Sequence, residues 1–99
     1  MDRKSPSGYT FQGFTIPARM AGGIDRWIEA GIPPGHFLAA VICNDLRDAI
    51  ARADAENLAN LPAYIGYFHN EAPSACWGSP KKFAEWARRF IPLPQPLEP

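Results

Sequence analysis

The sequence predicts an all-α fold, a small bundle of four to five helices with an extended N-terminal segment and a Pro-rich C-terminal tail. Apolar residues recur at three- and four-residue spacing through most of the chain, which indicates amphipathic helices. Glycines and prolines fall between these periodic stretches, where helices end and begin. We therefore expect an N-terminal arm over residues 1–15, a helical domain over 16–91 and a disordered tail over 92–99.

The composition is that of one small globular domain. Apolar residues make up 46% of the 99 residues, and ten basic residues balance ten acidic ones. Zero net charge argues against a protein that coats nucleic acid, because such binding depends on clustered Lys and Arg. It also removes the repulsion that keeps copies apart. With three Trp and six Phe in so short a chain, we expect a homo-oligomer.

The two cysteines form no visible disulfide framework, and the two histidines lie far apart. Cys43 falls in an apolar helix and Cys76 in a turn-rich loop, so two free thiols in a reducing cytoplasm are expected. Ligands at metal-binding spacing are missing, and we predict no metal and no cofactor. Met1–Ser7 lacks the apolar stretch of a signal peptide, and no run is long enough to span a membrane.

The N-terminal residues are predicted to be extended. Met1–Gly8 is polar and is expected to be a mobile arm. Tyr9–Ile16 alternates aromatic or aliphatic residues with polar ones, which is typical of a strand, but a lone strand has no sheet to join. We therefore expect an extended segment that lays its aromatic side chains across the helices.

The first helix is predicted from Pro17 to about Ala30, with Thr15 as its cap. Gly22-Gly23 interrupts it at a cost of about 1 kcal/mol per glycine. A close helix crossing explains such a pair more readily than the approach of a ligand. Gly31 ends the helix. The apolar stripe of this helix comprises Met20, Ile24, Trp27 and Ile28.

A rigid corner and the most apolar helix follow. Pro33-Pro34 holds the chain extended, and the next helix is predicted to run unbroken over Gly35–Ala53. Asn44 and Asp45 would lie at its centre, where a purely structural helix would carry Leu or Ala. Their polarity at this position predicts a role beyond core packing.

Capping residues define the remaining helices. Asp54 is predicted to cap a short helix over 55–60, and Asn60 a further helix that ends near Asn70. Ser79-Pro80 is a typical start for a last helix over 81–90. The Pro-rich sequence from Pro92 onward predicts a polyproline tail.

Several short motifs together resemble a known family. They are Ile16-Pro17-Ala18-Arg19-Met20, Gly31-Ile32-Pro33-Pro34-Gly35, Phe37-Leu38, Ala40-Val41, Asn44-Asp45-Leu46, Ala53-Asp54, Asn57, Tyr67 to Asn70, Pro73, Cys76-Trp77-Gly78-Ser79 and Trp86. With these motifs, residues 16–88 resemble small, functionally uncharacterised proteins of bacteriophages and prophages. The resemblance implies a phage accessory protein in the cytoplasm of the host cell, and it implies no particular activity.

The first candidate site centres on the Asn44-Asp45 pair. On an unbroken helix Asn44, Asp45 and Asp48 would share one surface and could converge on a pocket. An Asn amide can read the edge of a nucleobase, and an arginine can bind phosphate oxygens. The arginines available are Arg19, Arg26 and Arg47. The alternative is a hydrogen-bond network that joins two helices or two subunits.

The second candidate site is the start of the last helix. Ser79 and the free N–H groups of the first turn could bind an anion. Lys81 and Lys82 lie at the helix end where the dipole disfavours cations, which a bound phosphate would explain. Trp77 could stack on a base. The alternatives are a capped helix with solvated lysines and a Trp that fills the core.

Catalysis and DNA binding are the less favoured interpretations. His69, Glu71 and Cys76 could form a nucleophile, base and orienting group, but no local signature surrounds them, and no catalytic residue is predicted. The corner at 31–35 joins two helices as in a helix-turn-helix motif. The helix after it, however, is apolar and acidic where a recognition helix is basic.

These features together predict a binding protein. The favoured hypothesis is a counter-defence sponge that sequesters an anionic nucleotide immune signal, without enzymatic activity. Each subunit is too small to enclose a nucleotide, so the pocket would lie between subunits. A protein–protein inhibitor or virion accessory that binds a host protein is the alternative. A Cys-dependent hydrolase is the third.

Overall fold

The computed structural model describes residues 3–91 and confirms the all-α prediction. In this part of the chain there are six α-helices, one 3₁₀ helix and one two-stranded hairpin. The elements are β1 (Thr10–Phe11), β2 (Phe14–Thr15), α1 (Ala18–Ala30), α2 (His36–Ile42), α3 (Leu46–Arg52), α4 (Ala55–Ala59), α5 (Leu61–Asn70), η1 (Ser74–Cys76) and α6 (Pro80–Arg89). The predicted tail over 92–99 lies outside the described residues.

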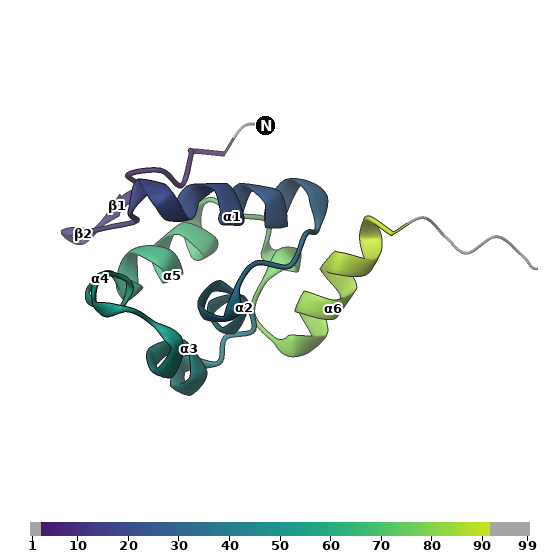
Figure 1. Cartoon of the computed structure of the whole chain (residues 1–99). Helices are drawn as coiled ribbons and strands as arrows, with labels where there is room; N and C mark the ends of the chain where they lie inside the picture. Colours follow the sequence, from purple (N-terminus) through teal and green to yellow (C-terminus); the bar gives the residue numbers. More distant parts are fainter. Residues whose placement is uncertain (1–2, 92–99) are drawn as a thin grey trace, which may run out of the picture.

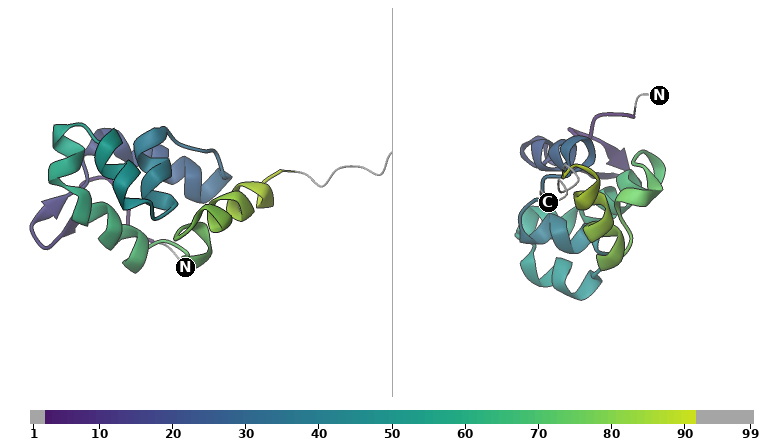
Figure 2. Two further views of the ribbon diagram at one scale, coloured as in Figure 1. Left: turned by 90° about the horizontal axis from the view of Figure 1, so that it is seen from below. Right: turned by 90° about the vertical axis from the view of Figure 1, so that its right-hand side faces the viewer.

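The helices pack around α1, which crosses the top of the molecule in Figure 1. Helices α2 and α5 lie beneath it, and α3 and α4 form the side away from it. The hairpin lies at one end and α6 at the other, as Figure 2 also shows from below. The core is therefore built from one long helix and several short ones.

Trp27 is the centre of the core and is fully buried. Its ring stacks on Phe83 with 4.5 Å between the ring centroids, and its Nε1–H donates to the carbonyl of Cys76 at 2.9 Å. The Trp86 Nε1–H in turn donates to the Trp27 carbonyl at 2.9 Å. Because both indole donors are satisfied inside the core, these contacts join α1, η1 and α6.

The predicted extended N-terminal segment folds back on itself as an antiparallel hairpin. Its two-residue turn, Gln12-Gly13, has φ of 53° and 85°, the positive angles that a tight hairpin turn requires. Phe11 then covers Gly66 of α5 so closely that a Cβ at Gly66 would lie 2.5 Å from the Phe11 ring. The hairpin supplies the second strand that the sequence did not indicate.

The unbroken helix predicted across α2 and α3 is wrong, because Asn44 interrupts it. Asn44 has φ 59° and its N–H donates to the Val41 carbonyl, while the Asp45 N–H donates to the Ala40 carbonyl at 2.9 Å. These bonds close the end of α2 with a left-handed residue. The Asp45 carboxylate then accepts from the Asp48 N–H at 3.0 Å and caps α3. The pair therefore ends one helix and begins the next.

Most predicted caps are confirmed. Gly31 ends α1 with φ 66°, and Asp54 and Ser79 accept hydrogen bonds from the first turns of α4 and α6. Thr15 is not the cap of α1, which has Pro17 at that position without a side-chain bond. Asn60 makes no capping bond either, because its side-chain amide oxygen Oδ1 accepts from the Thr15 N–H at 2.9 Å. The side chain of Asn60 thus joins α5 to the hairpin.

Residues 3–8 lie against α1 and α5. The Arg3 guanidinium pairs with Asp25 at 2.8 Å and Glu29 at 3.2 Å on α1. The Tyr67 hydroxyl on α5 donates to the Lys4 carbonyl at 2.5 Å. Contacts to two helices therefore hold this segment in place.

Candidate functional site

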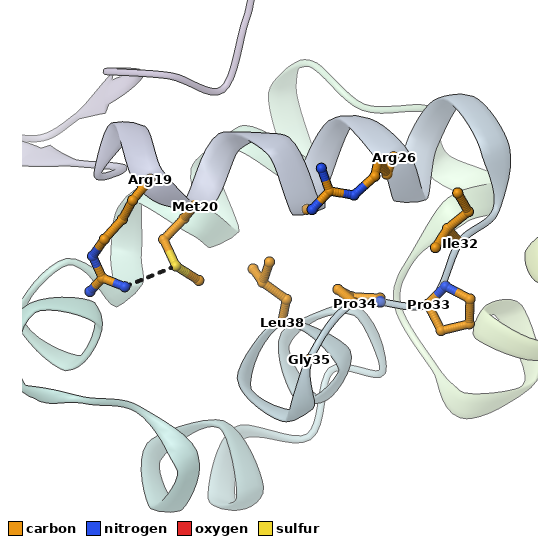
Figure 3. A pocket seen from close by; sticks show the side chains of 9 residues that line it. Arg19, Met20, Arg26, Ile32, Pro33, Pro34, Gly35 and Leu38 are labelled. Atoms are coloured by element: carbon orange, nitrogen blue, oxygen red, sulfur yellow. Dashed lines mark hydrogen bonds between the residues drawn. The ribbon is translucent and has the colours of Figure 1, made fainter.

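A pocket of about 260 Å³ lies between α1 and the corner at residues 32–35 (Figure 3). One wall is α1, and the other is the corner together with the start of α2. Its lining residues are Arg19, Met20, Gly23, Arg26, Ile32, Pro33, Pro34, Gly35 and Leu38. The pocket therefore combines an apolar surface with two arginines.

The glycine pair of α1 shapes this pocket. A Cβ at Gly23 would lie 3.2 Å from Leu38 Cδ1 and 3.9 Å from Pro34 Cβ, so the glycine lets α1 approach α2 closely. A Cβ at Gly22 would lie 3.0 Å from Arg26 Nη1. Gly22 therefore leaves room for the Arg26 guanidinium to fold back along its own helix. Gly23 therefore allows close packing of α1 on α2, and Gly22 allows the observed position of the Arg26 guanidinium.

Arg26 carries the free positive charge of the pocket. Its side chain runs back along α1 above Pro34 and Leu38 (Figure 3). Among residues 3–91 its guanidinium has no hydrogen-bond or ion-pair partner. A guanidinium beside an apolar wall is a ready donor for a phosphate or carboxylate group.

Arg19, at the other end of the pocket, is already paired. Its Nη2 lies 2.9 Å from Asp54 and 3.0 Å from Glu56, and its Nε lies 3.1 Å from Glu56. These hydrogen bonds, the one to Glu56 foremost, raise the pKa of Arg19. The Asn57 N–H and then Arg19 lower the pKa of Asp54. Arg19 and Asp54 are therefore charged at neutral pH, and the guanidinium of Arg19 is paired within the protein.

The cluster predicted around Asn44 does not meet the arginines of α1. Asn44 and Asp45 line a separate depression of about 20 Å³, which is room for about one water molecule. Arg47 is exposed on α3 without a partner among the described residues, and Asp48 pairs with Arg52 at 3.4 Å. The break between α2 and α3 therefore explains why Asn44 and Asp45 are polar, at the position where the sequence predicts a pocket.

Substitutions at Asn44 separate a backbone role from a ligand-binding role. Asn44→Ala is expected to cost about 1 kcal/mol of unfolding free energy, because alanine resists the left-handed conformation. Asn44→Gly is expected to be neutral within about 0.5 kcal/mol, since glycine adopts it freely. Chemical denaturation of both variants measures the difference. Equal destabilisation by Gly and Ala would show that the side chain itself is needed.

The second site predicted from the sequence is the start of α6. It belongs neither to the Arg26 pocket nor to the depression at Asn44. Ser79 caps α6, and Lys82 Nζ donates to the Ser74 carbonyl at 3.2 Å, which gives this lysine a structural partner. The Trp77 ring lies 5.7 Å from Phe68 and is half-buried. Lys81 is exposed and has no partner among residues 3–91. These contacts match a capped helix with solvated lysines.

The three residues considered for a hydrolase, His69, Glu71 and Cys76, make no hydrogen bond with one another among the described residues. Cys76 is fully buried, and burial raises the pKa of its thiol to about 11. The thiol is therefore protonated at neutral pH, whereas a nucleophile needs the thiolate. His69 lines a groove on α5, and Glu71 accepts from the Lys4 N–H at 3.3 Å. Within residues 3–91 no cluster of metal-ligating side chains forms, and no helix is both long and apolar enough to cross a membrane.

An apolar groove of about 420 Å³ on α5 was not predicted from the sequence. Its lining residues are Phe11 from the hairpin and, from α5, Leu61, Pro62, Ile65, Gly66, His69 and Asn70. Leu61 and Ile65 also border the small depression at α3, so the two hollows adjoin. The four-residue spacing of Leu61 and Ile65 is the signal that could have indicated this second apolar face. We call the surface formed by Leu46 and, one turn further on, Ile50 of α3 together with Leu61 and Ile65 of α5 the α3–α5 face.

No protein-family model matches the chain, and no curated protein or solved structure is significantly similar to it. Function therefore has to be inferred from the pocket and the surfaces of the chain itself. Arg26 and its surroundings are the strongest basis for that inference.

Proposed function

We propose that this protein is a phage-encoded binding protein that sequesters an anionic nucleotide, an immune signal of the host cell, in a pocket completed by a second subunit. The observation that carries the proposal is the Arg26 guanidinium, which lies in a pocket without a partner among the described residues. Arg19 lines the same pocket, but its guanidinium is already paired with Asp54 and Glu56.

The pocket has the chemistry that a nucleotide requires. A guanidinium binds two phosphate oxygens at once through its parallel N–H groups. The apolar side chains of Ile32, Pro33 and Leu38 line the same pocket and could contact a base or a ribose. Small-molecule sites commonly combine such apolar walls with a few polar groups that fix orientation.

The size of the pocket favours a second subunit. Ligand pockets enclose roughly 300–1,000 Å³, and the present one, at about 260 Å³, is smaller than that range. The α3–α5 face carries exposed Leu46 and Ile50, with 62% and 46% of their surfaces accessible. An apolar surface of this kind is a site of association, and we assign it to another copy of the chain. A neighbouring copy that places its own α3–α5 face over the Arg26 pocket would then supply the missing wall.

The resemblance of residues 16–88 to small phage proteins gives the setting. A protein made during infection meets host signals in the host cytoplasm. Binding without chemistry is enough to lower the free concentration of such a signal. The proposal therefore needs no catalytic group.

The proposal is tested by a thermal-shift panel of linear and cyclic nucleotides, together with light scattering on a sizing column. We expect an oligomer that one class of nucleotide stabilises by about 2.7 kcal/mol at a hundred-fold excess over Kd. A strict monomer that no nucleotide stabilises would contradict it.

A protein–protein inhibitor is the second candidate function, and the groove on α5 favours it. The groove is larger than the Arg26 pocket and mostly apolar, as sites for an apolar anchor of a partner protein are. A monomer without a nucleotide response would favour this function. Its partner would then bind at Phe11 and Ile65.

A further inference from the structure

The chain leaves α6 beside the Arg26 pocket. The Phe90 ring at the end of α6 packs on Gly31 so closely that a Cβ at Gly31 would overlap it. Ile32, the residue after Gly31, lines the pocket. The groove on α5 lies beside the hairpin, at the end of the molecule opposite α6 (Figure 2). Residues 92–99, which follow Ile91, therefore begin next to the Arg26 pocket and away from the groove.

The sequence of residues 92–99 matches the chemistry of that pocket. It reads Pro-Leu-Pro-Gln-Pro-Leu-Glu-Pro, so its side chains are mostly apolar and Glu98 is the one charged group among them. The pocket presents the complementary surfaces, which are apolar walls and the guanidinium of Arg26 without a partner among residues 3–91. A carboxylate and a guanidinium form paired N–H···O bonds. An apolar segment with one acidic group therefore fits the pocket in polarity and in charge.

The segment is long enough to bring Glu98 to Arg26. Arg26 lies four residues before the end of α1, which is about 6 Å along the helix axis at 1.5 Å per residue. The seven residues from Ile91 to Glu98 span up to about 22 Å at 3.1 Å per residue, the rise of a proline-rich chain. Prolines also reduce the conformational freedom that a segment loses on binding, because their φ angles are fixed. Length and composition therefore both favour a contact within the same chain.

We propose that residues 92–99 occupy the Arg26 pocket of their own chain when no nucleotide is bound, with the Glu98 carboxylate on the Arg26 guanidinium. The consequence for ligand binding rests on the proposed function and deepens it. A nucleotide phosphate has to displace this carboxylate before Arg26 can bind it. A group on a short linker acts at an effective concentration in the millimolar range. The segment is therefore a built-in competitor that raises the nucleotide concentration needed for binding.

The contact is measured first in the full chain without a nucleotide. The NMR signal of the Arg26 Nε–H, assigned by its absence in Arg26→Ala, is expected to move in Glu98→Gln, which removes the charge of the carboxylate. Glu71→Gln is the matched control and should leave the signal in place, because the Glu71 carboxylate accepts from the Lys4 N–H outside the pocket. The shift should not depend on protein concentration. A shift that appears only at high concentration would overturn the contact within one chain and indicate a neighbouring copy.

The second measurement is calorimetric titration with adenosine 5′-monophosphate at low salt. Glu98→Gln is expected to bind this probe about two- to five-fold more tightly than the wild-type protein, which is the range that one exposed ion pair gives. Added salt should shrink the gain, and Glu71→Gln should show none. In an Arg26→Ala background Glu98→Gln should change nothing, because the competitor and the phosphate share one guanidinium.

The two measurements separate this inference from the proposed function. An unmoved Arg26 signal in Glu98→Gln overturns the inference, even if the wild type binds a nucleotide. A moved signal without a gain in affinity for a bound nucleotide overturns the competition. If the signal moves but neither the probe nor any nucleotide of the panel binds the wild type or Glu98→Gln, the contact stands and the proposed function fails.

Discussion

Trp27→Ala is expected to lower the free energy of unfolding by about 3–5 kcal/mol, which approaches the whole stability of many small domains. The substitution removes a fully buried ring and its stack on Phe83. It also leaves the Cys76 carbonyl without the indole donor at 2.9 Å. Chemical denaturation followed by circular dichroism measures the loss.

Trp27→Phe separates the two contributions. The smaller ring keeps much of the packing but loses the N–H donor, so we expect a loss of about 1–3 kcal/mol. A loss below about 1 kcal/mol for Trp27→Ala would show that α6 and η1 do not depend on this residue. It would contradict the core described above.

Arg26→Ala is expected to weaken binding of the nucleotide that stabilises the protein best by about ten- to a hundred-fold. Hydrogen bonds to charged groups contribute about 1.5–3 kcal/mol, and a tenfold change corresponds to about 1.4 kcal/mol. The fold should tolerate the change, since the guanidinium has no partner among residues 3–91. Calorimetric titration gives the affinity, and thermal denaturation verifies the fold.

Arg88→Ala is the control for Arg26→Ala, because Arg88 is exposed on α6 and lies outside the pocket. Arg47→Ala tests the site first predicted from the sequence. Full affinity in both variants and a loss in Arg26→Ala places the ligand at α1. A loss of nucleotide affinity in Arg47→Ala alone would show that the ligand binds at α3 instead.

The helices were predictable wherever a cap marks their ends. Gly31, Asp54 and Ser79 each have one strong local preference, and the structure follows it. Asn44 has two possible local conformations, since asparagine occurs both on polar helix faces and in left-handed turns. The apolar spacing continues across the break because α3 carries Leu46 and Ile50, although both are exposed and Ala49 is the buried residue of that helix. Sequence periodicity alone therefore predicted one helix where two exist.

The pocket was predictable only in its parts. The sequence indicates Arg19 and Arg26 as phosphate ligands, but the site that it predicts for them centres on Asn44, which lies in a separate depression. The corner at 32–35 was interpreted as architecture alone, whereas it also forms a pocket wall. Which arginine is free depends on Asp54 and Glu56 from α4. Such a long-range contact leaves no local pattern in the sequence.

The hairpin and the groove share one cause. Gln12-Gly13 is a weak turn signal, because glutamine rarely adopts a positive φ. Once the turn forms, Phe11 lies over Gly66 and creates one side of the groove on α5. The groove is not predictable from an extended segment over residues 9–16, because it needs the turn that brings Phe11 over Gly66.

Recovery of the bound nucleotide tests the central claim most directly. The wild-type protein is saturated with the nucleotide that stabilises it best, separated from free ligand, heated to unfold it, and the released ligand is identified by chromatography. We predict an intact nucleotide in fixed ratio to the oligomer, and far less from Arg26→Ala. Recovery of a cleaved product, or equal recovery from wild type and Arg26→Ala, would contradict sequestration at this pocket.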